Sequence, residues 1–140
     1  KLKNVLEPLD LVITKAEHGE GKRSKWITSY TIACKSGNNF LEVGKVSTGI
    51  KEKGEELTYE DMTKLIKPLI IKGEGKEVIL KPKIIIEVAY EEIQKSPSSS
   101  SGYSLRFPRI KSLRYDKPLN EISDIKLVEK IYSSQRAKKP

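Results

Sequence analysis

The chain has 140 residues, of which 36% are hydrophobic, and its 27 lysines and arginines against 19 acidic residues give a formal net charge of +8. This length can bury a core without disulfides or metals, and the basic excess favours an anionic partner such as nucleic acid, a nucleotide or an anionic membrane surface. The single cysteine, Cys34, excludes an intramolecular disulfide, and the single histidine, His18, makes a zinc site implausible. No apolar run approaches the roughly 20 residues of a membrane span, so we expect an intracellular, cytoplasmic protein that contacts no membrane.

The first half of the chain predicts three strands. Residues 9–15 alternate apolar and polar side chains, and residues 26–35 and 40–46 form a hairpin about the turn at 36–39. A flexible basic loop is expected at 18–25. Strand periodicity leaves open whether Tyr30 faces the core or the solvent.

A short helix and two more strands are expected next. Thr58 can cap the helix, Asp61 stands in the capping-box position, and Pro68 ends it. Residues 78–80 and 84–90 then read as strands, and the latter has the clearest alternation in the chain.

The serine-rich segment at 96–102 is too poor in apolar residues to order itself, so we expect a mobile loop there. A final helix is predicted with Ser123 as its cap. Its apolar stripe consists of Ile125, Val128, Ile131 and Tyr132. Residues 136–140 are expected to form a frayed tail.

Between these two segments lies the most basic part of the chain, Ser104 to Lys117, with five cations and one anion. It begins as a strand, which Pro108 interrupts, and its composition favours a polyanionic ligand. The plain alternative is a solvated strand with extra basic residues. Five to six antiparallel strands with one helix between them favour a mainly β, oligonucleotide-binding (OB) barrel to which the last helix is appended.

Several stretches resemble the C-terminal OB domain of archaeal-type ATP-dependent DNA ligases. They are residues 9–12, 19–23, 41–49 and 104–118, with Arg-x-Asp-Lys at 114–117. Lys1-Leu2-Lys3 is similar to the motif that closes the adenylation domain of those enzymes. The resemblance implies that residues 1–8 end an upstream adenylation domain or linker, and that 9–135 form the OB domain.

The resemblance also implies roles for single residues. Arg114 and Lys117 would be catalytic, reaching over bound ATP and holding the pyrophosphate leaving group, a task that suits fixed cations. Asp116 would orient them, and Lys1 and Lys3 would lie near the α-phosphate.

Other residues would contact DNA by the same resemblance. The expected backbone contacts are Lys22, Arg23 and Lys25. Tyr30 would pack into the minor groove unless it is a core residue. Arg106 and Arg109 could serve either the nucleotide or the DNA, and we assign Arg106 to DNA and Arg109 to the nucleotide.

The family transfers AMP from ATP to a lysine in a Lys-x-Asp-Gly motif and then to the 5′ phosphate of a nick. This chain contains no such motif, so alone it should be inactive. The expected cofactors are ATP and Mg²⁺ in the full enzyme, with none bound by this domain alone. The expected partners are nicked duplex DNA, an adenylation domain in the same polypeptide and, as a further candidate, a sliding clamp. We expect the full enzyme to be monomeric and nucleoid-associated, and to act in replication, repair and recombination.

Two other functions stay open on the sequence. One is a stand-alone OB module that binds single strands, and the other is the OB domain of an mRNA capping enzyme. The Arg-x-Asp-Lys motif separates the ligase from the passive module. Burial of Arg114 and Lys117 in internal ion pairs, out of reach of a ligand, would argue against the ligase roles.

Overall fold

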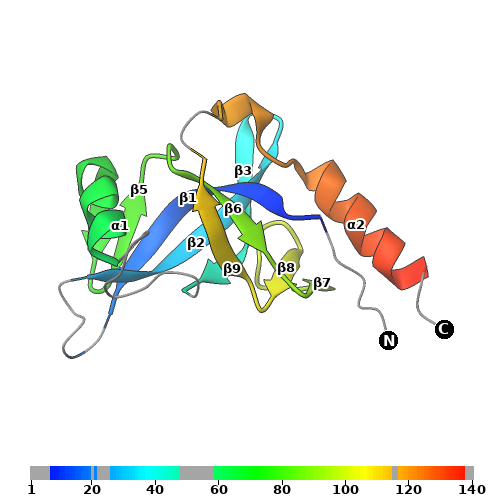
Figure 1. The fold of residues 1–140 in the computed structure, drawn as a ribbon, viewed down its shortest axis with the longest axis horizontal. Helices are drawn as coiled ribbons and strands as arrows, with labels where there is room; N and C mark the ends of the chain where they lie inside the picture. Colours follow the sequence, from blue (N-terminus) through cyan, green and yellow to red (C-terminus); the bar gives the residue numbers. More distant parts are fainter. Residues whose placement is uncertain (1–6, 20, 22–25, 48–58, 115–116, 138–140) are drawn as a thin grey trace.

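The structure, a computed structural model, describes residues 7–19, 21, 26–47, 59–114 and 117–137. Its α-helices are α1 (Tyr59–Ile66) and α2 (Ile125–Ala137). Two short 3-10 helices are η2 (Lys67–Leu69), directly after α1, and η3 (Leu119–Glu121), shortly before α2. The strands are β1 (Leu9–His18), β2 (Ile27–Ser36), β3 (Asn39–Val46), β4 (Ile70–Glu74), β5 (Glu77–Leu80), β6 (Ile85–Ala89), β7 (Glu92–Lys95), β8 (Tyr103–Arg106) and β9 (Arg109–Leu113). Figure 1 shows α1 and α2 at opposite ends of the strands.

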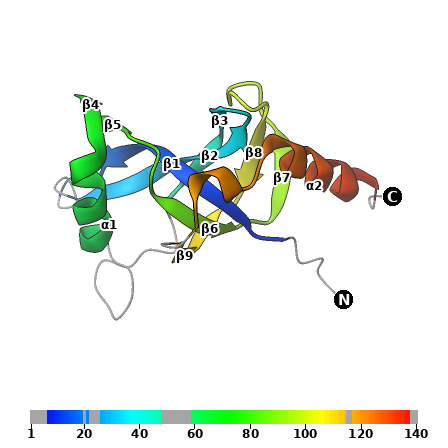
Figure 2. The ribbon, with the colours of Figure 1, turned by 90° about the horizontal axis from the view of Figure 1, so that it is seen from above.

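The long strand β1 organises the sheet. It pairs with β2 along most of its length, with β6 through its first half and with β5 through its second half, always antiparallel. Register shifts between Ile13 and Lys15 and between Glu17 and His18 let one strand serve these neighbours. β3 extends the sheet beyond β2, β4 beyond β5 and β9 beyond β6, whereas β7 and β8 form a separate pair (Figure 2).

This architecture confirms the predicted mainly antiparallel β fold with one helix between strands and one after them. The chain curls so that β8 lies beside β3, where the Ser101 N–H donates to the Glu42 carbonyl at 3.3 Å. In the described part of the chain no continuous ladder joins β3 to β8, so the barrel is not closed by strand pairing there.

Two apolar clusters hold the fold together. The main core fills the inside of the curled sheet, with Leu11, Ile32 and Ile86 among its fully buried members. A smaller cluster lies on the other face of β1 and β2, where Ile122 packs on Ala33 and its neighbours. β2 is therefore buried on both faces.

The helices begin and end close to their predicted limits. α1 ends at Ile66, one residue before η2, which contains Pro68, and buries Met62 against the core. α2 buries Val128, as its stripe predicts, but its cap is Asp124 and not Ser123, because the Asp124 carboxylate accepts the Leu127 N–H at 2.9 Å. None of the helices among the described residues is long and apolar enough to cross a membrane.

Three segments differ from the predictions. Strands β4 and β7 were not expected, and the serine-rich segment is held in place rather than mobile. There the Ser100 hydroxyl accepts the Glu42 N–H at 2.8 Å, and the Gly102 N–H donates to the Ser99 carbonyl at 3.0 Å. Hydroxyls and backbone groups supply the contacts that apolar side chains lack, so the expectation of a loop unable to order itself was wrong.

Candidate nucleotide and nucleic-acid site

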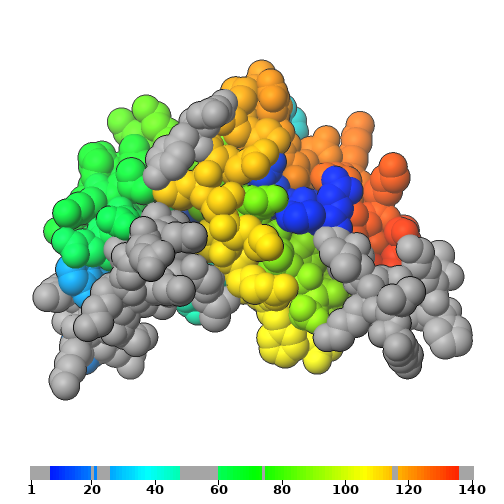
Figure 3. Space-filling model, in the orientation of Figure 1, coloured from blue at the N-terminus to red at the C-terminus, as the bar shows by residue number. Residues whose placement is uncertain are grey.

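The basic stretch is divided between two sheets. β8 pairs with β7 and β9 pairs with β6, and the break falls at Phe107 and Pro108. Phe107 has φ +52°, a left-handed conformation that is rare for a bulky residue and marks a strained position. In Figure 3 the gold atoms of β9 lie in the middle of the visible face, so this strand is on the surface.

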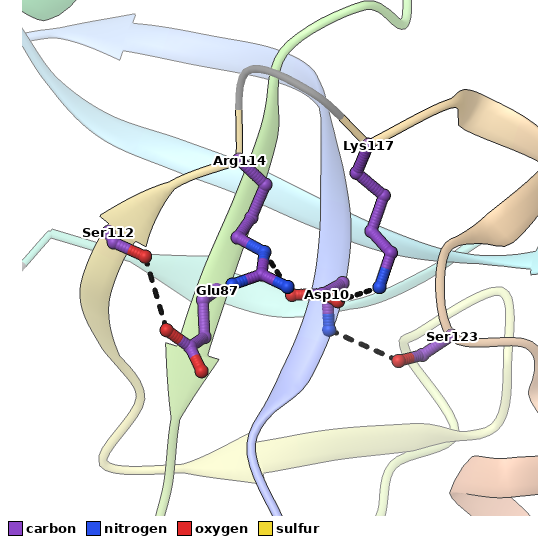
Figure 4. Close-up of polar contacts among 6 residues, drawn as sticks. All are labelled: Asp10, Glu87, Ser112, Arg114, Lys117 and Ser123. Atoms are coloured by element: carbon purple, nitrogen blue, oxygen red, sulfur yellow. Dashed lines mark hydrogen bonds and ion pairs between the residues drawn. The ribbon is translucent and has the colours of Figure 1, made fainter.

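Beyond β9 two of the predicted cations meet at one carboxylate. Lys117 Nζ donates to Asp10 Oδ2 at 2.6 Å, and Arg114 Nε lies 3.5 Å from Asp10 Oδ1 (Figure 4). The exposed fractions of the side chains are 41% for Arg114, 25% for Lys117 and 16% for Asp10. The mostly buried carboxylate therefore lies beneath two cations that are more exposed than it is.

Backbone hydrogen bonds fix each part of this cluster. The Asp10 N–H donates to the Ser123 hydroxyl at 3.1 Å, and the Ser123 N–H donates to the Asp10 carbonyl at 2.9 Å. The Arg114 N–H donates to the Ile85 carbonyl at 2.8 Å. Strand β1, the end of β9 and the segment before α2 thus converge on Asp10, although the last two lie more than 100 residues after β1 in the sequence.

A second carboxylate lies on the neighbouring strand. Glu87 of β6 is opposite Asp10 in the ladder and accepts the Ser112 hydroxyl at 3.1 Å. Among the described residues, no group of three or more His, Cys, Asp or Glu side chains is placed to hold a metal ion. The cluster therefore suits anions and offers no metal site of its own.

The internal ion pairs occupy only part of the donors of Arg114 and Lys117. Within the described portion of the chain, the ion pair of Arg114 is with Asp10, nearest at Nε, and the structure shows no side-chain hydrogen bond of Arg114. A guanidinium has five N–H donors and an ammonium three, so donors remain for an external ligand. The ion pairing that would argue against the ligase roles is present, but it does not place Arg114 out of reach.

Asp10 was missed by the sequence analysis, which gave the orienting role to Asp116. Asp116 lies outside the described residues. The available signal was an acidic residue in a strand between Leu9 and Leu11, which are both fully buried. Its partners are too distant in sequence to be identified from spacing.

Arg106 and Arg109 flank Phe107 in the sequence, and Arg106 also lies against its exposed ring. Arg106 Nη1 lies 2.9 Å from Glu92, Arg109 Nη1 lies 3.6 Å from Glu91, and the Arg106 guanidinium lies 5.1 Å from the centre of the Phe107 ring. Phe107 is 64% exposed. An exposed ring beside a cation suits stacking on a base or sugar next to a phosphate.

Tyr30 corrects one expectation. Its side chain is fully buried, and its hydroxyl donates to the Ile27 carbonyl at 2.6 Å. Of the two alternatives, the structure has the core one, and the minor-groove contact was wrong because a side chain without exposed surface cannot pack against DNA. The other DNA and nucleotide residues of the prediction, Lys1, Lys3, Lys22, Arg23 and Lys25, lie outside the described residues.

Comparison with known proteins gives consistent matches. The family model described as "ATP dependent DNA ligase C terminal region" matches residues 23–117. A DNA ligase of Nanoarchaeum equitans is 57% identical over 141 residues, covering 97% of this chain and 25% of its own length. A DNA ligase of Archaeoglobus fulgidus is 47% identical over 137 residues, covering 96% and 24%. The chain thus spans about a quarter of the length of the curated relatives it matches.

Solved structures show the same likeness at the level of the fold. The ligase domain of Mycobacterium tuberculosis LigD aligns with a TM-score of 0.65 at 23% identity, over 83% of this chain and 38% of that one. A mycobacterial DNA ligase D complexed with ATP and MES aligns with a TM-score of 0.63 at 19% identity, over 84% and 38%.

Proposed function

The chain belongs to the family of ATP-dependent DNA ligase C-terminal regions, and on this premise we propose that it assists adenylylation of the ligase lysine by ATP and grips nicked duplex DNA during sealing. The matching relatives are DNA ligases, which favours this assignment over a single-strand-binding module or a capping-enzyme domain. The adenylation domain that supplies the lysine would belong to the same polypeptide.

The pair of Arg114 and Lys117 carries the first part of the proposal. Loss of pyrophosphate from ATP builds negative charge on the departing oxygens, and preplaced cations stabilise that charge. The Arg114 side chain is 41% exposed and its guanidinium offers a planar fork for two phosphate oxygens, while Lys117 adds a compact point charge. Arg109, which is half-exposed at the start of β9, would add to the phosphate contacts.

ATP and Mg²⁺ relate differently to the described residues. The cations fit the phosphates of ATP, whose use belongs to the family. The described residues include no cluster of metal ligands, so they do not fit Mg²⁺, and we assign them no step that involves it.

A second surface would hold DNA. Phe107 would stack on an exposed base or sugar, and Arg106 beside it would pair with the phosphate backbone. Lys22, Arg23 and Lys25 stay predicted phosphate contacts. Their sequence, with two glycines in the same loop, suits a close approach to the backbone. The sliding clamp, the monomeric state and the nucleoid association also stay predictions.

The test separates two steps of the ligase that carries this chain. Arg114→Ala and Lys117→Ala should each lower the rate of lysine adenylylation about a hundredfold or more, because each removes a donor to the leaving group. Sealing of a nick that already carries AMP should change only a few-fold. Lys111→Ala, an exposed cation on β9, is the matched control and should leave both rates unchanged. Equal losses in the two assays would contradict the leaving-group role.

A further inference from the structure

We propose that Asp10 is a positioning residue for adenylylation, which holds Arg114 and Lys117 in the geometry that receives the leaving phosphates. This inference rests on the proposed function, because it matters only if these cations serve the nucleotide. It adds an acidic residue of the first strand, remote in sequence from the basic stretch, to the same site.

The geometry makes Asp10 a bridge between the cations. Each carboxylate oxygen takes one of them, Oδ2 at 2.6 Å from Lys117 Nζ and Oδ1 at 3.5 Å from Arg114 Nε. Without an anion between them, two neighbouring positive charges would repel each other and separate. Because the carboxylate is mostly buried, water screens these contacts less than those of a fully exposed pair.

Asp10 itself is rigidly held. Its N–H and its carbonyl both bond to Ser123, and its neighbours Leu9 and Leu11 are fully buried. Long Arg and Lys side chains lose much rotamer freedom when they are fixed in one place. An anchor that orders them before ATP binds removes that loss from the reacting complex, so its effect should fall on the rate of the chemical step.

The contact points on the two cations suit an anchor better than a competitor for the site. The shortest contact of Asp10 with the guanidinium is at Nε, and the Arg114 side chain remains 41% exposed (Figure 4). Lys117 donates one of its three protons and keeps two. Both cations can therefore bind phosphate oxygens while they remain on Asp10.

Glu87 supplies a matched control. It is opposite Asp10 on the adjacent strand, so its removal changes the local charge by the same amount. Its recorded partner is the Ser112 hydroxyl, and within the described residues it makes no ion pair with Arg114 or Lys117. Comparing the two acids distinguishes positioning from a general change of field.

The experiment uses the full ligase with Asp10→Asn or Glu87→Gln. In each preparation we would measure the rate of lysine adenylylation by labelled ATP and the rate of sealing of a pre-adenylylated nick. Their ratio is independent of the folded fraction. For Asp10→Asn the ratio should fall about tenfold, equivalent to about 1.4 kcal/mol of transition-state stabilisation, with less change in KM for ATP. For Glu87→Gln it should stay within about twofold.

Coupling provides a second readout. In a background with both Arg114→Ala and Lys117→Ala, Asp10→Asn should cause no further loss, since the residues act as one unit. An unchanged or raised ratio in the single variant, an equal fall for Glu87→Gln, or additive losses would overturn the role of Asp10. If Arg114→Ala and Lys117→Ala themselves spare adenylylation, the proposed function fails instead, so the two failures are distinguishable.

Discussion

Substitutions of Tyr30, the buried tyrosine of β2, can test whether this side chain stabilises the core or contacts DNA. Tyr30 has no exposed surface and donates its hydroxyl to the Ile27 carbonyl at 2.6 Å. Tyr30→Phe removes one buried hydrogen bond and should cost about 1 kcal/mol of unfolding free energy. Tyr30→Ala also empties the volume of the ring and should cost about 3 to 5 kcal/mol.

Urea denaturation of the 140-residue chain measures both effects. With a denaturant slope of about 2 kcal/mol per M, the midpoint should fall by about 0.5 M for Tyr30→Phe and about 2 M for Tyr30→Ala. Tyr103→Phe is the control, because Tyr103 is only partly buried and its hydroxyl makes no hydrogen bond to any of the described residues. Its midpoint should hardly move.

DNA affinity then completes the test. Where the variants remain folded, their affinity for nicked duplex DNA should equal that of the parent chain. A Tyr30→Ala chain as stable as the parent but weaker on DNA would refute the core assignment and restore the minor-groove contact.

Two further predictions concern residues at opposite extremes of exposure. Phe107→Ala should weaken the affinity for nicked DNA about tenfold through lost stacking, and its unfolding free energy should stay within about 0.5 kcal/mol of the parent. The control is Ile71→Ala, at a residue on β4 that is 61% exposed, and it should change neither quantity. Equal losses of affinity for both variants would contradict a specific contact. Burial raises the pKa of the Cys34 thiol from 9.0 to about 11. As the pH rises, the unfolded chain therefore loses this proton before the folded chain does. The unfolding free energy should fall by up to about 3 kcal/mol between pH 9 and 11. In denaturation curves across that range Cys34→Ala should lose less, and parallel losses would show that the thiol does not contribute.

The sequence predicted elements whose signals are local. The hairpin of β2 and β3 follows from alternating apolar residues about a turn in which Gly37 has φ +59°, and α1 follows from its acidic first turn and the proline after it. Strand β7 was not predicted, because its four residues are mostly Glu, Gln and Lys and do not alternate like a typical strand. What makes it one is pairing with β8, across the serine-rich segment.

The candidate site was predicted in its cations but not in its anion. Arg114 and Lys117 are close together in sequence, so their motif can be recognised there. Asp10 comes into contact with them only when the sheet has formed. The face of Tyr30 was undecided for a similar reason. Residues of both parities in β2 are buried, since Ile122 and its neighbours cover the face away from the main core, and period-two alternation therefore carries no information there.

The amide of Gln135 near the end of α2 has a consequence for the solubility of shortened chains. Its Oε1 accepts the Ile93 N–H at 2.6 Å and its Nε2 donates to the Ile93 carbonyl at 2.8 Å, so one side chain stands where a further strand would otherwise add to β7. A chain truncated before Gln135 would leave the N–H and carbonyl of Ile93 without these partners on an exposed edge strand. Such an edge can pair with a strand of another molecule, which leads to self-association. We therefore expect the last turns of α2 to protect this edge strand from self-association as well as to stabilise the fold.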